Sequence, residues 1–227
     1  MLASDSQRTE DGFREEIPKL FVTPTGIVWG VAGSIAVQHE LRALLDALDV
    51  APQPSRKEAR DGIATALVTA VRQATAAMDE PSPAARTVHG IFAWHSRIEN
   101  ETFLLRVLEN GLAEPAEKYV AVGLPEAKRL AQFALSQREH LGYAGVRLDI
   151  ARMVAFNAVD DVIRASARSV GHPVQLAEVT ADRHEVLGTA ELQGVADTLA
   201  AFREHQRDFL VRDDVLGEDR DTGIRPS

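Results

Sequence analysis

Four histidines from widely separated parts of the sequence are the side chains best suited to chemistry: His39, His95, His140 and His205. Each lies in a stretch whose apolar residues recur at helical spacing, and Glu99 follows His95 by four residues. On a helix, at about 100° per residue, that spacing turns both side chains in nearly the same direction. Imidazole nitrogen and carboxylate oxygen suit metals such as iron, manganese or zinc. Asp208, three residues after His205, offers a second carboxylate to such a site.

The elements that would position these side chains are predicted to be helices. Ser55 and Glu58 have the spacing of a capping box, in which each side chain satisfies a free backbone amide at a helix start. Alanine, leucine, arginine and glutamate recur throughout the chain and favour helix. A glycine weakens a helix interior, so we expect a break near Gly142 or Gly145. The predicted helices span residues 26–48, 55–78, 84–109, 124–170 and 189–212.

Composition narrows the classes of function. The sequence has 25 Lys and Arg against 34 Asp and Glu, a formal net charge of −9, which disfavours nucleic acid and anionic membranes as partners. It has no cysteine, so disulfides, thiolate catalysis and cysteine-based metal sites are excluded. Any metal must therefore be held by His, Asp, Glu or Tyr.

The chain is expected to be one domain with loose ends. Residues 1–19 are polar and mixed in charge, which predicts a flexible N-terminal arm, and residues 217–227 predict a flexible tail. Between them, residues 20–216 are expected to form a single helical bundle. The longest apolar run, residues 26–37, is too short to span a bilayer, and the start of the chain does not resemble a signal peptide. These features predict a cytoplasmic protein.

Four short motifs resemble the ligand helices of hemerythrin-like (HHE cation-binding) proteins, in the same order. They are His39-Glu40-Leu41, His95-Ser96-Arg97-Ile98-Glu99, Arg138-Glu139-His140-Leu141 and Phe202-Arg203-Glu204-His205-Gln206-Arg207-Asp208. The resemblance spans roughly residues 30–215. It implies an all-α fold, a four-helix up-down bundle of hemerythrin-like type with additional helices.

The resemblance also implies a non-haem iron site, mono- or dinuclear, held by His39, His95, Glu99, His140, His205 and Asp208. Glu99, with Asp208, would bridge two ions, and an open position would take dioxygen, peroxide or nitric oxide. Ala144 stands where the family often has another histidine, and Phe209 where a glutamate is usual. With fewer histidines the site would have more open positions, which favours an iron-dependent oxidoreductase or a sensor over an oxygen carrier.

Two alternatives stay open at this point. One is another helical oxygenase, either a haem protein with one of these histidines as axial ligand or a diiron enzyme of different topology, acting on a small organic substrate. The other is a metal-free helical module that binds a partner. The sequence contains no Gly-rich phosphate loop after a strand and no nucleophile elbow, so a nucleotide cofactor is not indicated.

Overall fold

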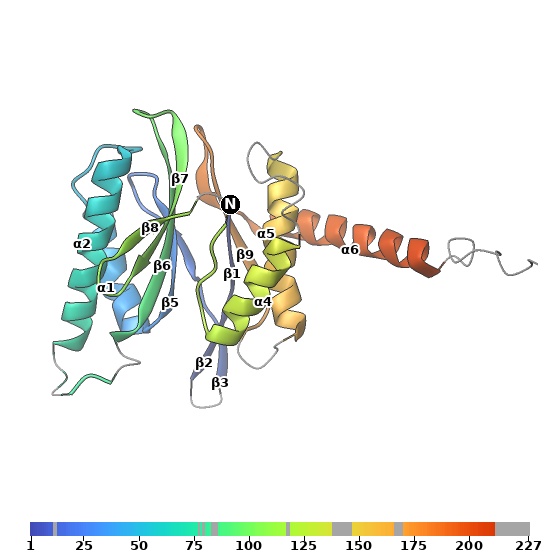
Figure 1. Ribbon diagram of the computed structural model, residues 1–227, viewed down its shortest axis with the longest axis horizontal. Helices are drawn as coiled ribbons and strands as arrows, with labels where there is room; N and C mark the ends of the chain where they lie inside the picture. The colour runs from blue at the N-terminus through green and yellow to red at the C-terminus, as the bar shows by residue number, and fades with distance from the viewer. Residues whose placement is uncertain are drawn as a thin grey trace, which may run out of the picture.

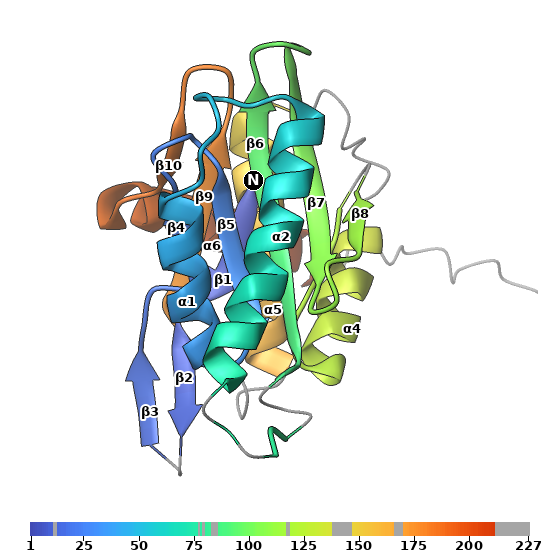
Figure 2. The same cartoon turned by 90° about the vertical axis from the view of Figure 1, so that its left-hand side faces the viewer.

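Two antiparallel sheets lie face to face between layers of helices in the computed structural model (Figures 1 and 2). The structure describes residues 1–10, 13–76, 78, 80–82, 86–116, 119–137, 147–165 and 170–211. The strands are β1 (Leu2–Asp5), β2 (Gln7–Glu10), β3 (Phe13–Glu16), β4 (Leu20–Val22), β5 (Val28–Gly33), β6 (Val88–Ser96), β7 (Glu101–Leu108), β8 (Ala113–Pro115), β9 (Val174–Val179) and β10 (His184–Val186). The helices are α1 (Ile35–Asp46), α2 (Arg56–Thr75), α4 (Pro125–Ser136), α5 (Leu148–Ala165) and α6 (Thr189–Val211).

The larger sheet has the strand order β4-β5-β6-β7-β8, and the smaller has the order β1-β9-β10. Strands β2 and β3 form a separate hairpin that projects below the body in Figure 2. Helices α1 and α2 cover the outer face of the larger sheet, and α5 covers the outer face of the smaller one (Figure 1). The order of layers is therefore helix, sheet, sheet, helix.

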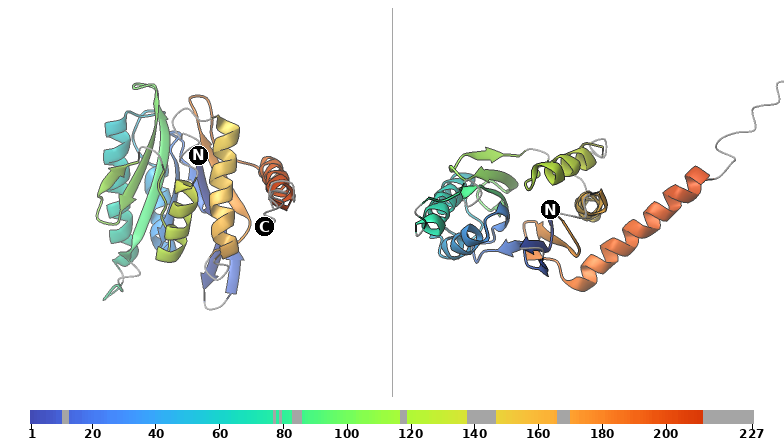
Figure 3. Two further views of the ribbon diagram at one scale, coloured as in Figure 1. Left: turned by 45° about the vertical axis from the view of Figure 1, so that its right-hand side comes forward. Right: turned by 90° about the horizontal axis from the view of Figure 1, so that it is seen from below.

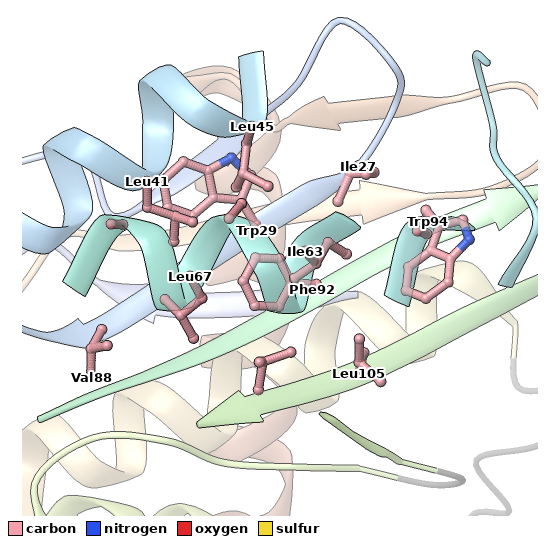
Figure 4. Close-up of a cluster of buried hydrophobic side chains, with 14 of the residues drawn as sticks. Ile27, Trp29, Leu41, Leu45, Ile63, Leu67, Val88, Phe92, Trp94 and Leu105 are labelled. Atoms are coloured by element: carbon pink, nitrogen blue, oxygen red, sulfur yellow. The ribbon is translucent and has the colours of Figure 1, made fainter. Parts of the chain in front are cut away.

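The side chains of β5 and β6 alternate between two buried faces, as the period of a strand requires. Trp29, Phe92 and Trp94 face α1 and α2, where they pack with Leu41 and Ile63 (Figure 4). Neighbouring residues point the other way and join the layer between the sheets, made up of Leu2, Leu20, Val28, Ala93, Ala177 and Val179. Both faces of these strands are covered, so their sequences are almost continuously apolar.

The prediction of an all-α four-helix bundle is wrong. Residues 88–96 and 101–108 pair as an antiparallel hairpin, with Phe92 opposite Leu105 and His95 opposite Thr102. Residues 28–33 form β5, so the first helix begins only at Ile35. Valine, isoleucine and aromatic residues fit a pleated surface covered on both faces, and packing of this kind overrides the helix propensity of nearby residues.

Parts of the helical prediction are confirmed. Ser55 and Glu58 form the expected capping box at the start of α2, and α6 covers residues 189–211. The long region expected to be helical from residue 124 contains α4 and α5, and the predicted break at Gly142 or Gly145 lies outside the described residues.

The domain boundaries stay predictions. Residues 1–19, expected to form a flexible arm, contain β1, β2 and β3, and the expected tail at 217–227 lies outside the described part of the chain. In the described residues, no helix is both long and apolar enough to cross a membrane.

Candidate functional site

A lysine and an aspartate from separate elements form a largely buried ion pair at one end of the two-sheet sandwich. Lys19 immediately precedes β4, and Asp5 is the last residue of β1. The Nζ of Lys19 lies 2.9 Å from Oδ1 of Asp5, and the two side chains are 20% and 12% exposed. Because each charge has lost most of its water, the opposite charge beside it offsets part of that loss.

Backbone and side-chain contacts from β9 hold the pair in place. The Oε1 atom of Gln175 accepts a hydrogen bond from the backbone N–H of Lys19 at 2.8 Å, and its Nε2 donates to the carbonyl of Ile17 at 2.8 Å. The backbone N–H of Gly171 lies 3.4 Å from Oδ2 of Asp5. Gln175 therefore fixes the backbone on both sides of Pro18, and with it the backbone from which the Lys19 side chain extends.

A glycine on β5 allows the lysine backbone to approach. A Cβ atom at Gly30 would lie 2.8 Å from the carbonyl oxygen of Lys19 and 2.9 Å from the side chain of Leu20. The first of these contacts is with backbone, which cannot swing away. The absence of a side chain at Gly30 is thus part of how the sequence builds this end of the molecule.

The Lys19–Asp5 pair can transfer protons and stabilise a developing negative charge. An ammonium group offers three donors, and a carboxylate offers acceptors only. The side chain of Lys19 is partly open to solvent. Ser4 and Ser6 lie on either side of Asp5 in sequence, but side chains alternate along a strand, which points both hydroxyls away from the carboxylate. Ser6 is fully buried and its Oγ has no hydrogen-bond partner in the described part of the structure.

Sequence reasoning missed this pair. Asp5 and Lys19 both fall in the segment interpreted as a flexible arm, and they are 14 residues apart. Their spacing in the sequence does not correspond to a shared face of one helix or strand. The β2–β3 hairpin, which lies between them in the chain, brings them together instead. The one available signal was the short apolar run Leu20-Phe21-Val22 directly after Lys19, which marks a buried strand.

Three of the residues predicted to bind metal are exposed on separate helices. His39 lies on α1, whereas His205 and Asp208 lie on α6. In the views of Figure 3, α6 extends away from the body, on the far side from α1. The structure therefore does not bring His39 and His205 together. His140 lies outside the described residues.

His95 and Glu99 occupy the β6–β7 hairpin instead of a helix. His95 is buried, with Nδ1 3.2 Å from Oγ1 of Thr102. Glu99 lies in the turn, where it accepts hydrogen bonds from the Ser96 hydroxyl and from the backbone N–H of Arg56, the latter at 3.2 Å. The Ser96 hydrogen bond in particular holds the pKa of Glu99 below its usual value. Glu99 thus stabilises the start of α2.

The described residues contain no group of three or more His, Cys, Asp or Glu side chains that could hold a metal ion. The helical bundle expected around the metal is wrong, whereas the proposed set of metal ligands, which includes His140 outside the described residues, stays a prediction. Iron, with haem as its alternative, stays a prediction from sequence alone, as does a small diatomic, peroxide or organic ligand.

Comparison with known proteins finds similarity in structure only. No protein-family model matches the sequence, and no curated protein matches it. Among solved structures, Anbu (ancestral beta-subunit) from Yersinia bercovieri matches with a TM-score of 0.68 and 16% identity, over 92% of this chain and 91% of that one. The Anbu (Gly-1) mutant from Hyphomicrobium sp. strain MC1 matches with a TM-score of 0.65 and 16% identity, over the same shares. A structure described as the helical assembly of the Anbu complex from Pseudomonas aeruginosa matches with a TM-score of 0.62 and 19% identity, over 91% of this chain and 90% of that one.

These matches overturn the resemblance to hemerythrin-like proteins, and with it the function of a diiron protein that binds or activates oxygen. The motifs that carried it were short, and the one from His95 to Glu99 required a helix where the structure has the end of β6 and the β6–β7 turn. At 16–19% identity the likeness is one of fold and not of sequence. Over nearly its whole length, this chain has the α/β fold of the Anbu β-subunits.

Proposed function

We propose that this chain is a hydrolase subunit of the Anbu kind, which cleaves amide bonds at the Lys19–Asp5 pair and works in an assembly of identical copies. The observation that carries the proposal is this pair: a lysine and an aspartate, 2.9 Å apart and largely buried, in a chain with the Anbu fold. Hydrolysis of an amide requires a group that takes a proton from the nucleophile and one that stabilises the oxyanion. A lysine beside a carboxylate can provide both, because its neutral amine takes the proton and the ammonium group that results stabilises the oxyanion.

Lysine suits this role because it can lose and regain a proton. In one class of hydrolases an amine, either a lysine or the amine at the chain terminus, activates a hydroxyl nucleophile. Asp5 would hold Lys19 in position, and Gln175 would fix the lysine backbone. The attacking group would be a water molecule or a hydroxyl brought to Lys19.

The test of the chemistry is hydrolysis of a panel of fluorogenic peptide amides by the full chain. Lys19→Ala and Asp5→Asn should each lower kcat/KM by about 100-fold or more, the usual share of a proton-transferring group. Lys19→Arg keeps the charge but cannot give up its proton, so it should be as inactive as Lys19→Ala. Lys57→Ala, at an exposed position on α2, is the matched control and should keep full activity.

Two outcomes would reject the hydrolase proposal: no cleavage of any amide in the panel, or full activity of Lys19→Ala. Labelling by an electrophilic peptide inhibitor, followed by mass spectrometry, identifies the nucleophile. A covalent adduct on a hydroxyl supports a nucleophilic residue, whereas cleavage without an adduct supports activated water.

The assembly part of the proposal is supported by α6. Its apolar side chains Leu192, Val195 and Leu199 pack against the body, but Phe202, next in the same helical stripe, is 50% exposed. Figure 3 shows α6 extending away from the body. An apolar stripe that continues past its own core indicates a surface that another chain covers, and one Anbu structure is a helical assembly.

Light scattering coupled to size-exclusion chromatography, with negative-stain microscopy, tests the assembly. The full chain should elute as a multimer, and Phe202→Ser should shift it towards smaller species. Ile98→Ser is the matched control, since Ile98 is 73% exposed at the tip of the β6–β7 hairpin. A wild-type chain that is monomeric at all concentrations would reject the assembly while leaving the hydrolase proposal to its own test.

A further inference from the structure

Three segments meet at the end of the sandwich opposite to the Lys19–Asp5 pair. Gln53 lies in the loop between α1 and α2, Arg97 lies in the β6–β7 turn, and His184 is the first residue of β10. This end belongs to both sheets, because β6 and β7 are strands of the larger sheet and β10 is a strand of the smaller one. Contacts among the three residues therefore connect the sheets.

Gln53 is the centre of this contact. Its side chain is buried, and its backbone has a φ of 53°, in the left-handed region. Its backbone N–H donates to the carbonyl of Thr25 at 2.9 Å, and its carbonyl accepts from the N–H of Arg97 at 3.3 Å. The loop is thereby fixed against both the β4–β5 turn and the β6–β7 turn.

The orientation of the Gln53 amide is determined by its neighbours. The Nε of Arg97 donates to Oε1 of Gln53 at 2.6 Å, so that atom must be the oxygen. The Nε2 of Gln53 donates to the carbonyl of Ala181 at 2.9 Å, so that atom must be the nitrogen. Turning the amide over would set donor against donor at Arg97 and acceptor against acceptor at Ala181.

This orientation determines the protonation state of His184. Its Nε2 lies 3.3 Å from Nε2 of Gln53, and an amide nitrogen can only donate. The histidine must then accept at Nε2, which requires a neutral ring with its proton on Nδ1. Protonation of Nε2 would place two donors against each other.

Burial and the positive groups around His184 also favour the neutral ring. His95 approaches from β6 and Arg97 from the β6–β7 turn, and Asp182 is the acidic group facing it, from the β9–β10 turn. In the β4–β5 turn Gly26 lies against the imidazole ring, since a Cβ there would be 3.5 Å from it. Burial has the largest effect, and it lowers the pKa of His184 below its ordinary value. His95 and Arg97 also lower this pKa, whereas Asp182 has the opposite effect.

We propose that Gln53, Arg97 and His184 form an acid-sensitive joint between the two sheets, closed while His184 is neutral and opened when it takes a proton. Opening releases β10 and the β9–β10 turn from the α1–α2 loop. It also frees the Gln53 amide from Ala181. The inference rests on the contacts of these residues and not on the hydrolase proposal.

Histidine NMR of the full chain tests the joint directly. In the wild type, ring nitrogen shifts should report the Nδ1–H tautomer of His184, and its titration midpoint should fall below the ordinary value for a histidine. Gln53→Glu is the sharpest variant. A carboxylate oxygen can accept a hydrogen bond from protonated Nε2 of His184, whereas the amide nitrogen of Gln53 cannot. In Gln53→Glu the midpoint of His184 should rise above its wild-type value.

Amide hydrogen exchange measures the opening. Between pH 7.5 and pH 5.5, exchange of residues 181–186 should speed up in the wild type beyond the intrinsic change with pH, whereas residues 174–177 of β9 should show the intrinsic change alone. In His184→Gln, which cannot titrate, residues 181–186 should lose that extra change. A His184 that carries its proton on Nε2 at pH 7.5, or a Gln53→Glu midpoint no higher than the wild type's, would overturn the proposal.

Discussion

The two ends of the sandwich hold their buried polar groups in opposite ways. At one end Lys19 and Asp5 are a cation and an anion 2.9 Å apart, so the contact is an attraction between opposite charges. At the other end the contact of Gln53 with His184 requires an uncharged ring, and Arg97 beside it disfavours a second positive charge. Strand β4 leads from the first end towards the second, yet the two ends should respond differently to mutation and to pH.

The largest effect is expected from Lys19→Ala. It removes the ammonium group 2.9 Å from the largely buried Asp5, which should lower the free energy of unfolding by about 2–4 kcal/mol, somewhat less than for a fully buried pair because Lys19 is 20% exposed. Urea unfolding measures the loss. Asp5→Asn in the same chain should restore part of it, and Lys57→Ala should change stability by less than about 0.5 kcal/mol. If the single and double variants are equally unstable, the charge pairing is not what holds this end.

The next effect is expected from Gly30→Ala at the same end. The new Cβ would press on the carbonyl of Lys19, and overpacking of this kind costs about 1–3 kcal/mol. Gly194→Ala is a control of opposite sign. Gly194 is exposed on α6 with nothing near its Cβ direction, so this change should stabilise the chain by about 0.5–1 kcal/mol. Thermal unfolding of both variants checks the signs, and a neutral Gly30→Ala would show that Lys19 can shift freely.

A smaller effect is expected where α2 fixes the loop of the joint. Ser55 lies two residues after Gln53 and caps α2, so Ser55→Ala should cost about 1 kcal/mol. Thr198→Ala, at an exposed position inside α6, serves as the control and should cost little or nothing. Urea unfolding followed by circular dichroism gives both values. A Ser55→Ala loss no larger than that of the control would mean that tertiary contacts alone fix the loop.

The smallest effect at neutral pH is expected from Arg97→Ala, because Arg97 is exposed. At pH 7.5 it should cost less than about 1 kcal/mol. The sign of the pH effect follows from the lowered pKa of His184: the unfolded chain takes up a proton before the folded chain does, so folding stability falls as pH drops below about 6.5. Removing Arg97 takes away one source of that shift. Unfolding curves from pH 7.5 to 5.5 should therefore fall less steeply for Arg97→Ala, and a steeper fall would contradict this account of His184.

The ion pairs that connect α5 with α6 are only partly predictable from spacing in the sequence. Asp160 and Arg164 are four residues apart on α5 and form the ion pair that this spacing allows, at 2.8 Å. Arg203 of α6 also binds Asp160, together with Asp161 and Asn157, and nothing in the sequence links these distant positions. Burial of Asp160 opposes its charge, but the hydrogen bonds from Arg203 and Arg164 outweigh it and lower its pKa.

What the sequence determined by itself was local. The capping box at Ser55, the extent of α2 and α6, and the exclusion of cysteine chemistry all depend on residues close together in the chain or on composition. The His95 and Glu99 spacing was local too, but it predicts a shared helix face only if a helix forms there.

Only the tertiary structure decided that residues 88–108 are a hairpin, because their strand conformation depends on burial against α1 and α2 on one face and the smaller sheet on the other. The pairing of Lys19 with Asp5 and the joint at Gln53 were decided in the same way. In each of these contacts, strand pairing brings residues from separate segments to hydrogen-bonding distance. Strand pairing of this kind produces no regular spacing of residues that could be recognised in the sequence.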